Sequence, residues 1–144
     1  MMAKRIRILE PKAKELSFQR RLEQRAREIV KRRADSIWDG SPLSVVEREM
    51  AMTLSQMDHL RHVRWRMRRQ MFQLELRIDT RLIQLTPRSQ LQPDYHQERR
   101  AKLRDKLEKL DQERRKLDLE HEKQLRPLQD RLIILFNRHR QLNP

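Results

Sequence analysis

The chain has 144 residues, of which 39% are charged and 4% aromatic, and its formal net charge is +14. A single glycine excludes glycine-rich phosphate loops, and the lack of cysteine excludes disulfides, cysteine-ligated zinc and thiol nucleophiles. The remaining composition, rich in Leu, Arg, Lys, Glu and Gln, is typical of long helices and coiled coils.

The first expected helix covers residues 11–38. Pro11 suits the first helical turn, where its missing N–H would have no partner. Apolar residues recur every three or four positions from Phe18 to Ile37, which predicts an amphipathic helix. Gly40 follows as a stop signal.

The second expected helix is long and covers residues 42–86. Ser41 offers an N-cap and Pro42 suits the first helical position, while Ser44 opens an overlapping capping box. The main apolar residues of this segment recur at a mean spacing of about 3.5, the value of a coiled coil.

The third expected helix covers residues 94–143 and opens with a capping box at Asp94. Its leucines follow a heptad rhythm from Leu103 to Leu117. Pro127 is expected to kink or split this helix, because proline lacks the backbone donor that a helix interior uses.

The connector between the second and third helices is short, so we expect these helices to be antiparallel neighbours. The predicted fold class is therefore all-α. We expect an elongated antiparallel coiled-coil helical hairpin with an additional N-terminal helix, a three-helix arrangement that forms a single domain over residues 1–144.

The central segment carries a second apolar face, separated from the main stripe on a helical wheel. It consists of Leu54, Trp65, Phe72, Leu76 and Ile83. A helix with two apolar faces needs two partners. We expect the first helix to cover this face. The alternative is that Trp65, Phe72, Leu76 and Ile83 form a docking or dimer surface.

A third sector of the same helix is basic and contains no acid. It holds His62, Arg66, Arg69, Gln70, Gln73, Arg77, Thr80, Arg81 and Gln84. Guanidinium groups match phosphates, so this pattern predicts nucleic-acid contact, although an exposed charged face also serves solubility. The predicted nucleic-acid-binding residues are Arg61, Arg64, Arg66, Arg68, Arg69, Arg77 and Arg81, helped by Arg25, Arg32 and Arg33.

The sequence gives only weak signals for a metal site or a catalytic site. His59 and His62 are spaced for a shared metal, but no third ligand is near in sequence. His121 falls in the core register of the third helix, where a polar residue more often sets register than binds a ligand. We therefore expect no enzyme activity, no catalytic residues, no metal site and no cofactor.

The predicted function is a structural or accessory role in which the basic helix binds DNA, RNA or a ribonucleoprotein without strong sequence preference. The alternative is a protein–protein adaptor or scaffold that docks through the second apolar face or the apolar segment 128–142. An acidic protein is an alternative partner by the same electrostatics. A homodimer stays open, because long hairpins pair into four-helix bundles. The lack of a leader or a long apolar run predicts an intracellular, soluble protein with no membrane partner.

Overall fold

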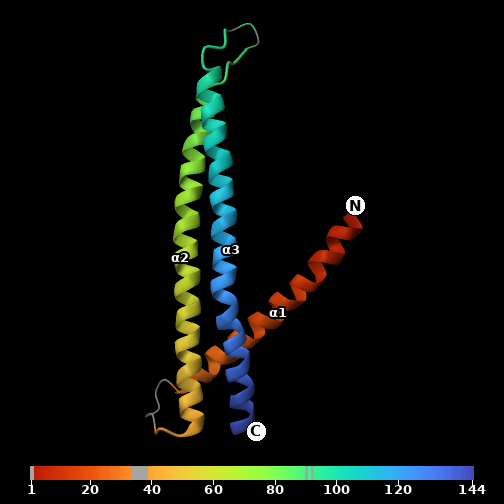
Figure 1. Cartoon of the computed structure of the whole chain (residues 1–144), viewed down its shortest axis with the longest axis vertical. Coiled ribbons are helices and arrows are strands. Elements are labelled where there is room, and N and C mark those ends of the chain that lie inside the picture. Colours follow the sequence, from red (N-terminus) through yellow and green to blue (C-terminus); the bar gives the residue numbers. More distant parts are fainter. Residues whose placement is uncertain (1, 34–38, 90, 92) are drawn as a thin grey trace. The chain divides into compact units, whose positions relative to one another are not determined.

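The computed structural model describes residues 2–33, 39–89, 91 and 93–144, with side chains described from residue 16 onward. It contains three α-helices, α1 (Met2–Arg33), α2 (Pro42–Leu85) and α3 (Gln97–Leu142), and no strand among the described residues (Figure 1). The protein is all-α, and α2 and α3 pair as a helical hairpin.

The chain divides into two compact units. Unit 1 comprises Met1–His59 and Gln124–Pro144, and unit 2 comprises Leu60–Lys123. Both α2 and α3 contribute residues to each unit, whereas α1 belongs to unit 1.

The start of α2 follows the expected capping signal. Ser41 Oγ accepts a hydrogen bond from the backbone N–H of Ser44 at 3.2 Å, so Ser41 is the N-cap. Asp39 Oδ1 in turn accepts from the N–H of Ser41 at 3.0 Å, and Gly40 between them has a φ of 73°. Ser44 lies within the first turn, so the second expected capping box is not the start of the helix.

The observed bounds of α1 and α3 differ from the expected ones. α1 begins at Met2, so Pro11 lies inside the helix; the preceding residues are rich in Lys, Arg, Ile and Leu, of which most favour helix. The expected end at Trp38 lies outside the described residues. α3 begins at Gln97, after the expected cap at Asp94.

The expected split of α3 at Pro127 does not occur, because the helix runs through this residue. Proline removes one helical hydrogen bond. The neighbouring Leu125 and Leu128 pack against the core of unit 1, and this packing holds the helix on both sides of the proline.

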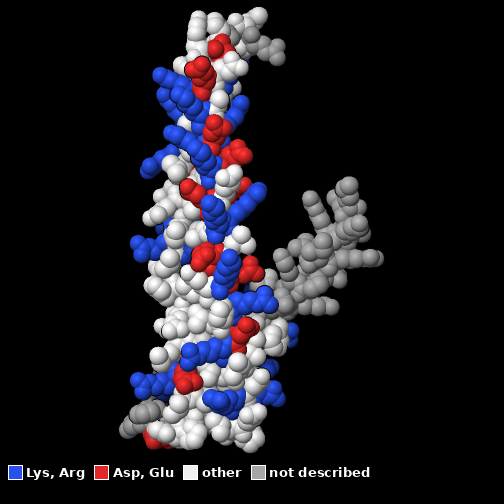
Figure 2. Space-filling view, viewed as in Figure 1, with Lys and Arg blue, Asp and Glu red and all other residues white. Residues whose placement is uncertain are grey.

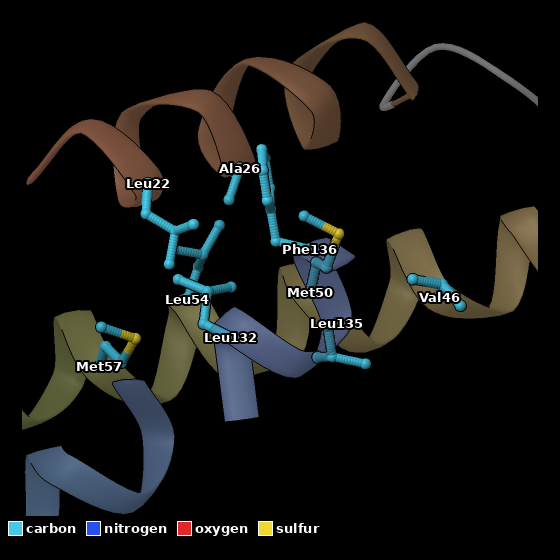
Figure 3. Packing of buried hydrophobic residues seen from close by; sticks show 9 residues of the cluster. All are labelled: Leu22, Ala26, Val46, Met50, Leu54, Met57, Leu132, Leu135 and Phe136. Atoms are coloured by element: carbon cyan, nitrogen blue, oxygen red, sulfur yellow. The ribbon is translucent and has the colours of Figure 1, made fainter. Parts of the chain in front are cut away.

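Unit 1 has a core built by all three helices (Figure 3). Leu22 and Ala26 of α1 point toward residues of α2 and α3. Ala26, Met50, Met57 and Leu132 have no exposed surface. The core consists of Leu22, Ala26, Val46, Met50, Leu54, Met57, Leu132, Leu135 and Phe136.

The core also takes up most of the apolar C-terminal segment. Leu132, Leu135 and Phe136 are buried, whereas Ile134 and Leu142 are exposed. His139 is buried as well, and its Nε2 lies 3.0 Å from Glu47 Oε1. The segment 128–142 therefore offers little of the docking surface that was its alternative role.

Unit 2 is a seam between two antiparallel helix segments. Within it, Ile78, Leu85 and Leu110 are the buried apolar side chains among the described residues. Val63 and Met67, which belong to the main apolar residues of α2 at coiled-coil spacing, keep large exposed fractions. A two-helix seam covers only one side of each helix, which leaves long side surfaces open.

The methionines divide between the units in the same way. Met50 and Met57 fill the core of unit 1, whereas Met52 and Met67 are exposed and Met71 is half-buried. Flexible thioethers therefore fill the core at two positions, whereas Met52 and Met67 contribute to the surface.

Candidate nucleic-acid interface

Two of the predicted phosphate-binding arginines are held by an acid of the opposite helix. Arg64 Nε donates to Asp118 Oδ1 at 3.0 Å, and Arg68 Nη1 donates to Asp118 Oδ2 at 3.1 Å. Arg61 is half-buried and has interactions of its own. Arg64 and Arg68 therefore join the two helix segments of unit 2, and Arg61 is also engaged in interactions.

The structure leaves four arginines of α2 exposed and without a carboxylate partner among the described residues. They are Arg66, Arg69, Arg77 and Arg81, which we call the arginine face. At 100° per residue, these side chains fall within one sector of about 120°. The amide of Gln84 accepts a hydrogen bond from Arg81 Nη1 at 3.3 Å, which leaves the guanidinium charge uncompensated.

The acids nearest in sequence lie on other sides of α2. Glu75 Oε2 accepts from Arg114 Nη2 of α3 at 2.7 Å. Asp79 lies on the same side as Glu75 by helical position and is half-buried. In Figure 2, the edge of unit 2 formed by α2 carries basic and uncharged side chains, while acids lie mostly over α3.

An exposed tryptophan borders the arginine face. Its ring stacks with His62 at a centroid distance of 6.1 Å and an interplanar angle of 21°. Arg69 Cζ lies 5.4 Å from the centroid of Trp65, within cation–π range. These contacts hold the guanidinium of Arg69 and the imidazole of His62 at one end of the face.

The second apolar face of α2 is divided by the structure. Leu54 is buried in the core of unit 1, as expected for cover by α1. Trp65, Phe72, Leu76 and Ile83 instead retain 56%, 57%, 49% and 75% of their surface exposed. Within unit 2, the partner helix α3 does not bury these four residues.

The predicted arginines of α1 lie in unit 1 and behave differently from one another. Arg25 and Arg32 are exposed and have no acidic partner within the described part of the chain. Arg33 Nε lies 2.6 Å from Glu47 Oε2, so this charge is compensated. Asp58, beside the histidine pair, accepts two hydrogen bonds from Arg27, at 2.6 and 2.8 Å.

Asp118 is an important residue that the sequence pattern did not reveal. Its partners lie on α2, whereas Asp111 pairs within α3 with Arg115 at 3.0 Å. The sequence does contain a signal for this contact. Arg64 and Arg68 are four residues apart and lie next to the main apolar residues of α2. Residues at that position face the partner helix of a coiled coil and pair with its charges.

Arg100 is a second residue that the sequence did not reveal. Its Nη1 donates to the carbonyl oxygen of Leu85, the last residue of α2, at 3.1 Å, and to Asp94 Oδ1 at 2.6 Å. The hydrogen bonds from Arg100 are the main cause that holds the pKa of Asp94 below its ordinary value. The buried arginine thus ties the end of α2 to the start of α3.

His121 is half-buried in unit 2, in the core register of α3. Burial lowers its pKa, and the nearby charges of Arg64 and Arg61 lower it further, against a smaller opposite effect of Asp118. The imidazole is therefore neutral at pH 7 and adds no positive charge to the surface.

The described residues contain no group of three His, Asp or Glu side chains placed to hold a metal ion. Within the same residues, no helix is both long and apolar enough to cross a membrane. No protein-family model, no curated protein and no solved structure matches this chain.

Proposed function

We propose that the protein binds nucleic acid through the arginine face of unit 2. The observation that carries the proposal is the contrast between the arginines that the fold pairs with acids and the four that it leaves free. An arginine that serves stability finds a carboxylate, as Arg64, Arg68 and Arg114 do. Four unpaired guanidiniums on one side of a helix form a row of bidentate phosphate donors.

The binding is expected to follow the phosphate backbone more than the bases. Arg66 and Arg81 are about 22 Å apart along the helix, at a rise of 1.5 Å per residue. Gln70, Gln73 and Gln84 lie in the same sector and add neutral hydrogen-bonding groups for sugar or phosphate oxygens. Contacts of this type are sequence-tolerant and salt-dependent.

The test compares two variants of equal net charge. One replaces the arginine face (Arg66→Gln, Arg69→Gln, Arg77→Gln, Arg81→Gln), and the control replaces four exposed lysines of α3 (Lys102→Gln, Lys106→Gln, Lys109→Gln, Lys116→Gln). Binding to labelled generic duplex DNA and to single-stranded RNA is measured by fluorescence anisotropy at low salt.

We expect the arginine variant to bind at least about tenfold more weakly than the wild type, because it lacks four phosphate contacts. The lysine variant should lose little, since these lysines are interspersed with acids. Equal losses in both variants, or tight binding by the arginine variant, would contradict the proposal. Circular dichroism checks that both variants keep their helix content.

A further inference from the structure

The apolar side chains beside the arginine face lie along one line on α2, which Arg69 and Asp79 interrupt. We name Trp65, Phe72, Leu76 and Ile83 the apolar stripe. Arg69 lies between Trp65 and Phe72, and the successive spacings of four, three, four and seven residues follow a heptad. Every member is about half exposed or more, although such residues are ordinarily buried.

The stripe has the dimensions of a helix-binding surface. From Trp65 to Ile83 it extends for about 27 Å, at a helical rise of 1.5 Å per residue. That length corresponds to nearly three heptads of a partner helix. Apolar anchors at heptad spacing are the pattern by which one helix packs onto another. A large exposed apolar line of this kind marks an interaction surface.

The charges on the two borders of the stripe differ. On the outer border, Arg66 and Arg77 are exposed and unpaired within the described residues, and Arg69 lies in the stripe itself. On the border toward α3, Arg68 is compensated by Asp118 and Glu75 by Arg114. Asp79 occupies the heptad position between Phe72 and Ile83 and is half-buried. Arg66, Arg69 and Arg77 outnumber this acid, so the net charge around the stripe is positive and comes mainly from the outer border.

This charge pattern disfavours a second copy of the chain as the occupant. In a two-fold antiparallel contact, the outer border of one copy lies beside the outer border of the other. This follows from the symmetry, because each pair of contacting residues occurs twice. Arg66 and Arg69 would then lie among equivalent arginines, and each copy carries a net charge of +14. Like charges at such flanking positions oppose pairing.

We infer that the apolar stripe docks an acidic amphipathic helix of a partner protein. The partner helix presents apolar residues at heptad spacing to Phe72, Leu76 and Ile83, and carboxylates on its flank to Arg66 and Arg77. Trp65 supplies an aromatic anchor at one end, the residue type most often found at interface hot spots. The apolar contacts of this interaction are separate from the proposed nucleic-acid contact, whereas Arg66 and Arg77 would serve both.

The probe for this proposal is a synthetic peptide of three heptads with Leu at both core positions and Glu at both flanking positions. A matched peptide carries Lys in place of the flanking Glu, and another carries Ser in place of the core Leu. The protein variant is Phe72→Ser with Leu76→Ser and Ile83→Ser. The control variant is Leu119→Ser with Ile134→Ser, two apolar residues that are about 60% exposed.

Fluorescence anisotropy of the labelled peptides gives the affinities near physiological ionic strength. We expect the Glu peptide to bind the wild type and the control variant, and to bind the stripe variant at least about tenfold more weakly. The Lys and Ser peptides should not bind. The stripe variant should retain its melting temperature and its affinity for DNA, since its three side chains are exposed and uncharged.

Several outcomes would overturn the inference. These are no binding of the Glu peptide, equal binding of the Lys peptide, or unchanged binding by the stripe variant. Sedimentation equilibrium supplies a further test: a wild-type dimer that the stripe variant abolishes would assign the stripe to a second copy. Loss of DNA affinity in the stripe variant would assign it to the nucleic-acid interface instead.

Discussion

The two units use similar helices in different ways. In unit 1, α1, α2 and α3 share one core, and Ala26, Met50, Met57 and Leu132 are completely buried. In unit 2, two helix segments share a seam, and the outer sides of α2 stay open. Packing of a third helix thus turns the amphipathic surfaces of unit 1 into a core.

The two units also differ in how far their charged side chains are paired. In unit 1, the buried Glu47 lies between His139 and Arg33, at 3.0 and 2.6 Å. In unit 2, seven arginines of α2 stand against two acids of the same helix segment. Ion pairs with α3 compensate Arg64 and Arg68, whereas the four arginines of the arginine face have no acidic partner among the described residues. Unit 1 therefore holds the three-helix core, whereas unit 2 presents the surface that we propose for recognition.

The largest expected effect is on the core of unit 1. Leu132→Ala should lower the free energy of unfolding by about 2–5 kcal/mol, because it removes a completely buried side chain and leaves a cavity. Leu107→Ala, at a half-buried position in the seam of unit 2, should cost about 1–2 kcal/mol. Leu119→Ala, at an exposed position, should stay within about 0.5 kcal/mol.

Urea denaturation followed by circular dichroism measures these differences, and hydrogen exchange shows which unit opens first. We expect the loss of unfolding free energy to decrease from Leu132→Ala through Leu107→Ala to Leu119→Ala. A larger loss for Leu107→Ala than for Leu132→Ala would show that the seam, and not the three-helix core, dominates stability.

The next largest effect tests the close approach of α1 within unit 1. Ala26 has no exposed surface, so Ala26→Leu has no space for its larger side chain and should cost about 1–3 kcal/mol. Ala101→Leu, at an exposed position on α3, is the matched control and should change stability by less than about 0.5 kcal/mol. Thermal unfolding of both variants measures the difference. Equal melting temperatures would mean that α1 does not pack as described.

The sequence predicted the helices well because they depend on local signals. Ser41 and Pro42 mark the start of α2, and heptad spacing predicts that α2 and α3 pair. α1 starts earlier than predicted, and of the two outcomes predicted for Pro127, a kink or a split, the structure excludes the split. Local rules for proline give only its cost, whereas packing of the surrounding helix decides whether that cost is tolerated.

The candidate site was harder to predict, because it depends on which charges meet across the hairpin. A helical wheel identifies Arg66 and Arg77 as residues of one face. It does not show that Asp118 of α3 holds Arg64 and Arg68, since that contact joins residues about 50 positions apart. The wheel also cannot tell how much of α2 the first helix covers.

A smaller effect is expected from the ion pairs of Asp118 with Arg64 and Arg68. Asp118→Asn removes the carboxylate charge that compensates Arg64 and Arg68. Because these side chains are more than a third exposed, we expect a stability loss of at most about 1 kcal/mol. DNA affinity should rise slightly at low salt, since the variant carries one negative charge fewer on unit 2. Anisotropy measures the change, and a weaker affinity would argue against phosphate binding by unit 2.

The smallest expected effect is a pH dependence from His121. The folded protein lowers the pKa of this imidazole, so the unfolded chain binds a proton more readily. The contribution of His121 to stability is complete above the unfolded pKa of about 6.5 and declines as the pH falls through the lowered folded pKa. His121→Gln should flatten this decline in urea midpoints measured from pH 7.5 to 5. An identical pH profile for wild type and variant would refute the assignment.

The central claim is that the four free arginines of unit 2 contact phosphates. Its most direct test is the slope of log affinity against log salt for duplex DNA, because each phosphate contact contributes about 0.9 to that slope. We predict that the arginine-face variant has a slope smaller in magnitude by about 3 to 4 than the wild type, while the lysine control keeps most of the wild-type slope. Equal slopes for the two variants would show that binding follows net charge alone and would contradict the account.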